Sequence, residues 1–234
     1  MHSNGAGKAL SGKVFNLFQI GALLFTIYLV PSTQAANGPG NPAEENSQVQ
    51  ALPTPGTYKI DPDHTFTYFS ARHHLVGRVR GRFEKTEGSI TVSQDPAACS
   101  VDITIDALSI STQNAQRDAD LRGPAYFDVK QFPTIKYQGR GIHNVSGNSW
   151  TMDGSLTIRG VSKVVPLTFT FSGIFPNTKP GRPARAAFHA SAATKRADFG
   201  MTRDNLMELG PAPGSQTDVE IEIDVEADAT IAAQ

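Results

Sequence analysis

The chain of 234 residues contains one cysteine, Cys99, and therefore cannot form an internal disulfide. Small secreted domains without a large core usually depend on disulfides, so this chain must draw its stability from side-chain packing. Cys99 has no basic neighbour in the sequence that would activate its thiol. We expect it to be half-buried and inert.

An excess of charge of one sign is also lacking, because 21 basic residues stand against 22 acidic ones. Nucleic-acid-binding domains normally carry a clear basic excess, so we expect no nucleic acid as a partner. The sequence holds no G-x-S-x-G or H-E-x-x-H motif. Its two Arg-Asp segments, "RDADL" and "KRADFGM", are more typical of hydrogen-bonded pairs that hold a loop than of acid–base catalysis.

A long apolar run occurs once, at residues 14–30, after Lys8 and Lys13. Small residues follow it up to Ala35. These features predict a secretory signal peptide, residues 1–35, that is cleaved after Ala35. A retained membrane anchor is the alternative, although the run is short for a span of about 20 residues.

Residues 36–56 are rich in Pro, Gly, Asn and Gln and cannot form a packed core, so we expect a flexible leader. The folded domain is expected at 57–229, where apolar and polar residues alternate with the period of half-buried β-strands. The alternating stretches are 66–74, 88–92, 100–106, 134–139, 150–160, 165–171 and 219–226.

Helical patterning is scarce. The one candidate, Ser111–Gly123, offers Ser111 or Thr112 as its N-cap and ends before Pro124. About eight strands joined mostly by short turns predict a mainly β fold with an antiparallel sheet closed on itself, because closure removes exposed edges. Such a barrel is just wide enough for side chains or one small ligand; a two-sheet sandwich is the alternative.

In the stretch "YFSARHHLVGRVRGRF", residues 68–83, His73 stands beside His74. Three arginines spaced two residues apart follow these histidines within the same stretch. Adjacent strand residues point to opposite faces, so the two histidines cannot ligate one metal ion, and we expect no metal site. We interpret His73 as a structural or ligand-contacting residue. The arginines 78, 80 and 82 share one face, which we favour as a solvated outer surface over a basic stripe for anionic lipid.

The face predicted to point inward combines large apolar residues with small ones such as Ala71, Gly81, Gly154 and Ala190. The pattern fits two arrangements equally well. One is a solid core in which small and large side chains interlock, and the other is an apolar tunnel that suits a long hydrocarbon.

Four ordered motifs, "YKIDPDHTFTYFSARHHLVGRVRGRF", "RDADLRGPAYFDVKQFPTIKY", "GSLTIRGVSKVVPLTF" and "KRADFGM", resemble the YceI-like family of bacterial periplasmic lipid-binding proteins. The resemblance implies an extended, lipocalin-like eight-stranded antiparallel β-barrel with a short helical insertion. It implies that the barrel holds a polyisoprenoid, an isoprenoid quinone or a similar long-chain amphiphile, without catalytic residues or a cofactor. It further implies a periplasmic location and an associated membrane cytochrome of the b561 type, and it leaves a homodimer open.

The family's motif residues that this chain retains are Asp61, Pro62, His64, Phe69, His73, Arg196, Asp198, Phe199 and Gly200. The helical segment departs from the family pattern at Asp120, where a histidine is usual, and at Gly123-Pro124. The expected ligand-binding residues are Phe69, Ala71, His73, Phe83, Ile90, Ile103, Ile105, Leu121, Phe127, Tyr137, Leu156, Phe169, Phe171, Phe188, Ala190, Arg196, Asp198 and Phe199.

The leading hypothesis is a carrier that holds a lipid without covalent chemistry. One alternative is an enzyme that acts on a lipid or quinone through His73 and a carboxylate such as Asp198. The other is a solid-cored interaction module that docks on a membrane protein through its arginine face.

Overall fold

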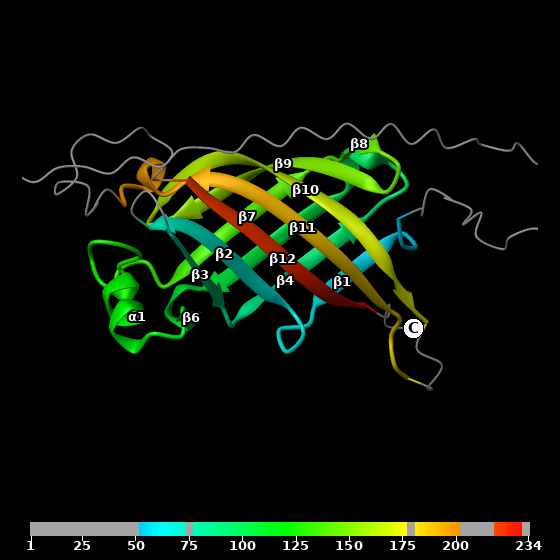
Figure 1. The fold of residues 1–234 in the computed structure, drawn as a ribbon. Helices are drawn as coiled ribbons and strands as arrows, with labels where there is room; N and C mark the ends of the chain where they lie inside the picture. Colours follow the sequence, from blue (N-terminus) through cyan, green and yellow to red (C-terminus); the bar gives the residue numbers. More distant parts are fainter. Residues whose placement is uncertain (1–51, 74–76, 177–180, 202–217, 231–234) are drawn as a thin grey trace, which may run out of the picture. The chain divides into compact units, whose positions relative to one another are not determined.

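A computed structural model describes residues 52–73, 77–176, 181–201 and 218–230 (Figure 1). The predicted signal peptide and most of the predicted leader lie outside these residues and stay predictions. Within the described part of the chain, no helix is both long enough and apolar enough to cross a membrane.

The described residues form twelve strands in one antiparallel sheet. The strands are β1 (Gly56–Ile60), β2 (Phe66–His73), β3 (Gly77–Phe83), β4 (Thr86–Val92), β5 (Ser100–Asp106), β6 (Ile110–Ser111), β7 (Thr134–Arg140), β8 (His143–Ser146), β9 (Ser149–Ile158), β10 (Val161–Phe175), β11 (Arg185–Lys195) and β12 (Asp218–Ala229). One α-helix, α1 (Ala115–Arg122), and three 3-10 turns, η1 (Pro96–Ala98), η2 (Ala107–Ser109) and η3 (Arg196–Phe199), complete the description.

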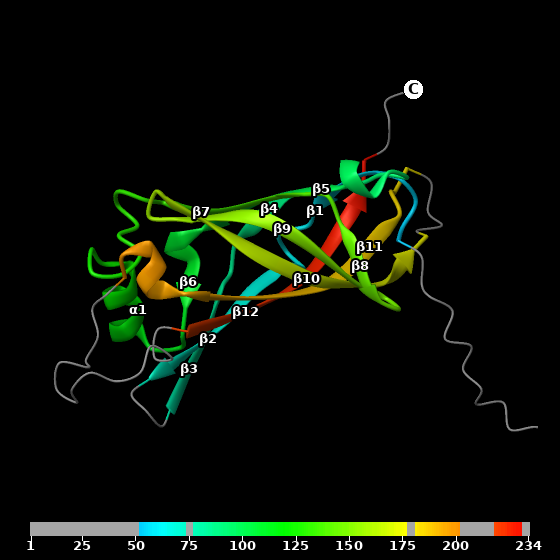
Figure 2. The ribbon, with the colours of Figure 1, turned by 90° about the horizontal axis from the view of Figure 1, so that it is seen from above.

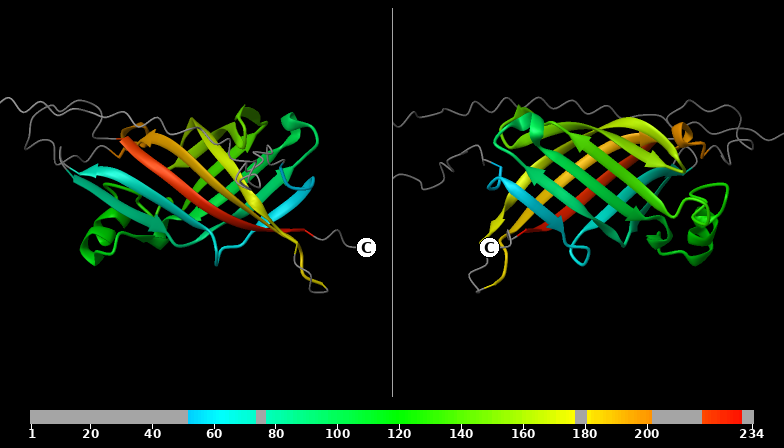
Figure 3. Two further views of the ribbon diagram at one scale, coloured as in Figure 1. Left: turned by 45° about the vertical axis from the view of Figure 1, so that its right-hand side comes forward. Right: turned by 180° about the vertical axis from the view of Figure 1, so that it is seen from behind.

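These strands make a closed barrel of eight long strands, as the sequence predicts (Figures 2 and 3). Three of the eight are broken in the middle, so that β1 and β2, β3 and β4, and β5 and β6 each count as one, while β8 pairs only with β9. The long strand β12 closes the ring by pairing with β1 through Ala227–Ala229 and with β2 through Val219–Asp224. The sandwich alternative is therefore wrong, because a sandwich has no such closing pair.

The three breaks are neighbours in the sheet and keep their hydrogen bonds. The Asp61 N–H donates to the Glu226 carbonyl at 2.9 Å, and the Asp106 N–H donates to the Lys85 carbonyl at 3.0 Å. In the core beside the breaks, the hydroxyl oxygens of Thr67 and Thr86 lie 3.0 Å apart. The breaks therefore interrupt the strands while these backbone groups and hydroxyls keep hydrogen-bond partners.

Helix α1 lies where the sequence predicts, but it begins later. Its N-cap is Asn114, whose side chain accepts the Arg117 N–H at 3.0 Å. The predicted cap residues are wrong: Ser111 pairs with Arg82 in the sheet, and the Thr112 hydroxyl donates to the Asp118 carboxylate at 2.5 Å. The sheet extends the backbone at Ser111, and Asn caps a helix as well as Ser does.

Candidate functional site

Two cavities occupy the interior of the barrel, one towards each end. The larger lies towards α1 and has a volume of about 140 Å³. The smaller lies towards the opposite end, beside Leu52, and has a volume of about 60 Å³. The interior is thus a packed core with two hollows, an arrangement between the solid core and the apolar tunnel that the sequence leaves as alternatives.

The large cavity collects most of the predicted ligand-binding residues. They are Phe69, Ala71, Phe83, Ile103, Ile105, Leu121, Phe127, Tyr137, Leu156, Arg196 and Phe199. Leu121 comes from α1 and Phe199 from η3, so these two elements cover the α1 end of the cavity. The Phe199 side chain is 1% exposed, which makes it part of a fixed wall.

The small cavity is lined by the predicted residues Ile90, Ile103, Phe169, Phe188 and Ala190. Cys99 also lines it and is 3% exposed, so the expectation of a half-buried thiol is wrong. Its sulfur accepts the Ser93 N–H at 3.3 Å. The turn between β4 and β5 folds the sulfur inward, and a local pattern does not reveal that burial.

Two predicted residues, Phe171 and Asp198, are not among the described residues that line the two cavities. Phe171 is buried against Phe188, with ring centroids 5.4 Å apart. Asp198 is exposed and borders an outer groove with Lys195 and Asp218. The side chain of His73 lies outside the described part of the structure, so its role stays a prediction.

Several lining residues were not predicted. They are Thr67, Tyr126, Ile135, Met152, Ile158, Val165, Leu167, Ala192, Met201, Val219, Ile221, Ile223 and Val225, among others. For β12 the signal was present, because the stretch "VEIEIDVE" alternates without a break. Nothing local shows that its apolar face looks onto a hollow rather than onto packed side chains.

The hydroxyl of Tyr137, a polar group at the wall of the large cavity, is satisfied by the backbone. The Tyr137 hydroxyl lies 3.0 Å from the Val165 carbonyl and 3.2 Å from the Met152 carbonyl, to which it can donate. Burial, together with the nearby Asp153 carboxylate, raises the pKa of Tyr137 well above its usual value. The phenol is therefore neutral, and it leaves an apolar surface towards the cavity. Arg196, half-buried at the α1 end, adds a charged side chain to this wall.

The arginine face lies on β3 at the outside of the barrel, and β2 separates it from a row of acids on β12. Arg78 forms a bidentate ion pair with Glu220. Arg82 lies 3.2 Å from Glu84 and also 4.9 Å above the ring of Phe66. These pairs support the interpretation of a solvated outer surface rather than a basic stripe.

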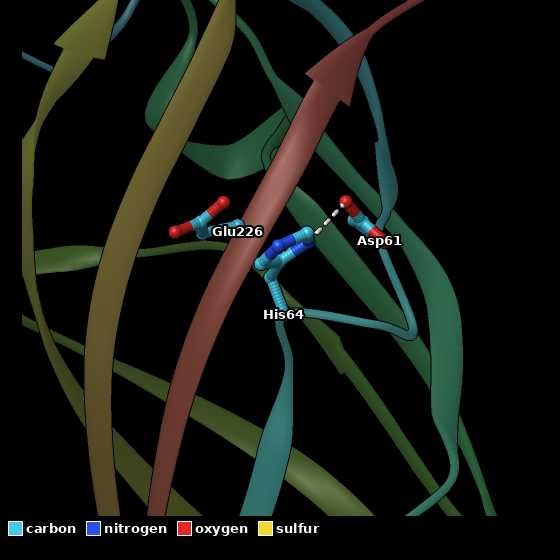
Figure 4. A group of neighbouring side chains, drawn as sticks. All are labelled: Asp61, His64 and Glu226. Atoms are coloured by element: carbon cyan, nitrogen blue, oxygen red, sulfur yellow. Dashed lines mark hydrogen bonds and ion pairs between the residues drawn. The ribbon is translucent and has the colours of Figure 1, made fainter.

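A second charged cluster joins the β1–β2 break to β11 and β12. The Nδ1 of His64 donates to Asp61 at 2.9 Å, and Glu226 lies on the neighbouring strand (Figure 4). Burial alone would raise the pKa of Asp61, but the His64 hydrogen bond, the Asp63 N–H and the Arg185 charge lower it overall.

The ligand atoms of Asp61, His64 and Glu226 lie within 4.8 Å of one another, close enough for one metal ion. The guanidinium of Arg185, however, lies 2.7 Å from Asp61 and 2.8 Å from Glu226, and it also holds Asp228 at 2.7 Å. Arg185 contacts all three carboxylates and neutralises part of their charge, so the cluster connects the β1–β2 segment to β11 and β12. The sequence did not reveal it, because Asp61 and Glu226 are far apart in the chain.

The domain matches a known family. A family model described as the YceI-like domain matches residues 58–227. A UPF0312 protein of Pseudomonas aeruginosa is 34% identical over 172 residues, which cover 72% of this chain and 85% of that protein. A UPF0312 protein of Yersinia pestis is 33% identical over 172 residues, which cover 72% of this chain and 84% of that protein.

Solved structures share the barrel. The Campylobacter jejuni YceI protein superposes with a TM-score of 0.57 at 26% identity, over 68% of this chain and 90% of that one. BcnA of Burkholderia cenocepacia gives 0.59 at 20% identity, over 72% and 99%. A polyisoprenoid binding domain from Saccharophagus degradans gives 0.55 at 16% identity, over 74% and 98%. At such low identities the last two similarities establish the fold alone.

Proposed function

This chain belongs to the YceI-like family, and from that premise we propose that it is a periplasmic carrier that holds a long-chain isoprenoid amphiphile inside its barrel. The class of ligand includes a polyisoprenoid and an isoprenoid quinone. The carrier binds and releases its ligand without covalent chemistry. The b561-type cytochrome that the family resemblance implies stays a prediction, and a homodimer stays open.

The observation that carries the proposal is the lining of the two cavities. Aliphatic and aromatic side chains from strands around the whole ring face the hollow space. A hydrocarbon placed there gains on the order of 25 cal/mol for each Å² of apolar surface removed from water. Fixing a flexible chain offsets part of this gain, so a long, mostly apolar ligand fits the site better than a small polar one.

The family neighbours support the same class of ligand. One protein with this fold is described as a polyisoprenoid binding domain. The Arg196 guanidinium lies at the α1 end, and its N–H groups suit a quinone oxygen. We therefore place the polar head of the ligand at that end and the hydrocarbon chain along the barrel.

The periplasmic location rests on the sequence of residues 1–35, with its two lysines, apolar run and small-residue cleavage site. Fractionation of cells that express the full chain tests this part alone. A mature protein found in the periplasmic fraction and beginning after Ala35 is the expected result. A full-length protein in the membrane fraction would instead indicate a retained anchor.

The experiment that tests the binding is mass spectrometry of an organic extract from protein purified from its native periplasm. A stoichiometric isoprenoid is expected, and Ala71→Trp, which fills the large cavity, should remove it without unfolding the barrel. Ala193→Trp, at an exposed position of β11, is the matched control and should keep the ligand. An empty extract combined with no uptake of added isoprenoids would contradict the proposal.

A further inference from the structure

The two cavities share three lining residues: Ile103, Leu167 and Ile223. Ile103 lies on β5, Leu167 on β10 and Ile223 on β12. In the ring, two long strands separate β5 from β10, one separates β10 from β12, and two separate β12 from β5. The three side chains therefore reach the interior from three sides, at the level where one cavity ends and the other begins.

These three side chains are held by apolar packing. They are 3%, 7% and 6% exposed, respectively. Their sheet neighbours at the same level include Met152 beside Leu167 and Ala190 beside Ile223. Leucine, isoleucine and methionine change rotamer without breaking a hydrogen bond, so the passage can open at the cost of packing alone.

We propose that Ile103, Leu167 and Ile223 form a constriction that selects ligands by chain length, an inference that rests on the proposed isoprenoid carrier. A short chain occupies the large cavity and stops at the constriction. A longer chain displaces the three side chains and continues into the small cavity, where it buries further apolar surface.

The dimensions support this division. Val219 lines only the large cavity and Val225 only the small one. They are six residues apart on β12, which corresponds to about 20 Å along the strand. A chain that reaches both hollows must therefore pass the level of Ile223 between them.

The protein carries its own reporter for this passage. Trp150 is the single tryptophan of the chain and is buried. It stacks on Phe169 of the small cavity, with ring centroids 5.9 Å apart. A chain that enters the small cavity should change the fluorescence of Trp150, whereas a chain confined to the large cavity should leave it unchanged.

The test measures binding to the mature protein, which begins after Ala35. The ligands are three prenyl alcohols of increasing length: farnesol, geranylgeraniol and solanesol. Native mass spectrometry gives the affinity, and Trp150 fluorescence reports whether the chain passes the constriction. In Leu167→Ala the ratio of solanesol to farnesol affinity should rise about tenfold, because longer chains no longer displace a side chain.

Leu156→Ala is the matched control. It removes the same side chain at a similarly buried position, but Leu156 lines only the large cavity. All three alcohols reach this cavity, so their affinities should shift together and their ratio should stay unchanged. If Leu167→Ala fails to fold, Leu167→Met, which conserves volume and is more flexible, should raise the ratio in the same direction.

Ala190→Phe tests the opposite change, because Ala190 lines only the small cavity. Solanesol should then bind at least about tenfold more weakly and no longer affect Trp150, while farnesol binding stays as it is. A length preference that is the same in Leu167→Ala, Leu156→Ala and Ala190→Phe would overturn the constriction but leave the carrier intact. Binding of none of the three alcohols to the unaltered protein would overturn both.

Discussion

The ring of Tyr137 on β7 occupies the space that a side chain at Gly154 of β9 would need. A Cβ atom at position 154 would lie 2.3 Å from Cζ and 2.4 Å from the hydroxyl oxygen of Tyr137. The same ring lines the large cavity, and its hydroxyl lies 3.0 Å from the Val165 carbonyl on β10. The absence of one side chain thus sets the position of a cavity wall.

Gly154→Ala should lower the free energy of unfolding by about 2 kcal/mol, because the Tyr137 ring must leave its position in a packed core. Urea denaturation measures the loss. Combined with Tyr137→Leu, which removes the obstructing ring atoms, the same alanine should cost clearly less than it does alone. Equal costs in both backgrounds would contradict the proposed contact.

The stability of the barrel should fall as the pH rises above 10.0, the usual pKa of tyrosine. Burial raises the pKa of Tyr137 in the folded protein, with Asp153 contributing further. The unfolded state therefore loses this proton first, so the stabilisation is complete below pH 10.0 and decreases above it. Denaturation midpoints measured on both sides of this pH check the sign.

Tyr137→Phe is the control for the pH effect. It should cost about 1 kcal/mol at neutral pH through the lost hydrogen bond. Its stability should then depend less on alkaline pH than that of the unaltered protein. Tyr58, whose pKa burial also raises, keeps its own contribution in both proteins. Parallel pH curves for the two proteins would rule out the assigned role of Tyr137.

Arg185→Lys should destabilise the barrel by about 1 kcal/mol, because a single ammonium cannot replace a planar fork. The guanidinium contacts Asp61, Glu226 and Asp228 from a half-buried position. Thermal denaturation measures the change. Arg80→Lys makes the same substitution at an exposed position of β3 and should be nearly neutral. Similar losses of stability in both variants would argue against a special role of Arg185 in joining these strands.

Asp118→Asn should loosen α1 from the barrel. The buried carboxylate accepts both the N–H and the hydroxyl of Thr112, at 2.8 Å and 2.5 Å. Weakening these charge-assisted bonds should cost about 2 kcal/mol and speed amide hydrogen exchange along α1. Asp120→Asn, at an exposed position of the same helix, is the control. Unchanged exchange in Asp118→Asn would show that other contacts hold the helix.

The predicted ligand-binding residues show where the sequence is informative. Residues such as Phe69, Ile105 and Leu156 alternate with polar neighbours, and the structure places all three at the large cavity. Asp198 came from a motif rather than from alternation, and it lies at an outer groove. A motif does not state which way its polar side chain points, whereas a regular strand does.

The helix start illustrates the opposite case. Ser111, Thr112 and Asn114 are all good N-cap residues within four positions. The choice among them depends on where the sheet ends, and Ser111 is held by its pairing with Arg82. The local preference for N-cap residues identifies three candidates. The pairing with β3, which is distant in sequence, leaves Asn114 as the N-cap.

The sequence by itself determined most of the strands and their inward faces, because the two-residue period of a strand is a local property that needs no partner. It favoured a closed barrel but left a two-sheet sandwich as the alternative. Only the tertiary structure decided that β12 closes the ring, that Arg185 joins Asp61 to Glu226, and that Ile103, Leu167 and Ile223 line both cavities. Such contacts join residues from remote parts of the chain, and the hollows are what packing leaves unfilled. Neither is encoded in any local pattern, because both depend on the closed ring as a whole.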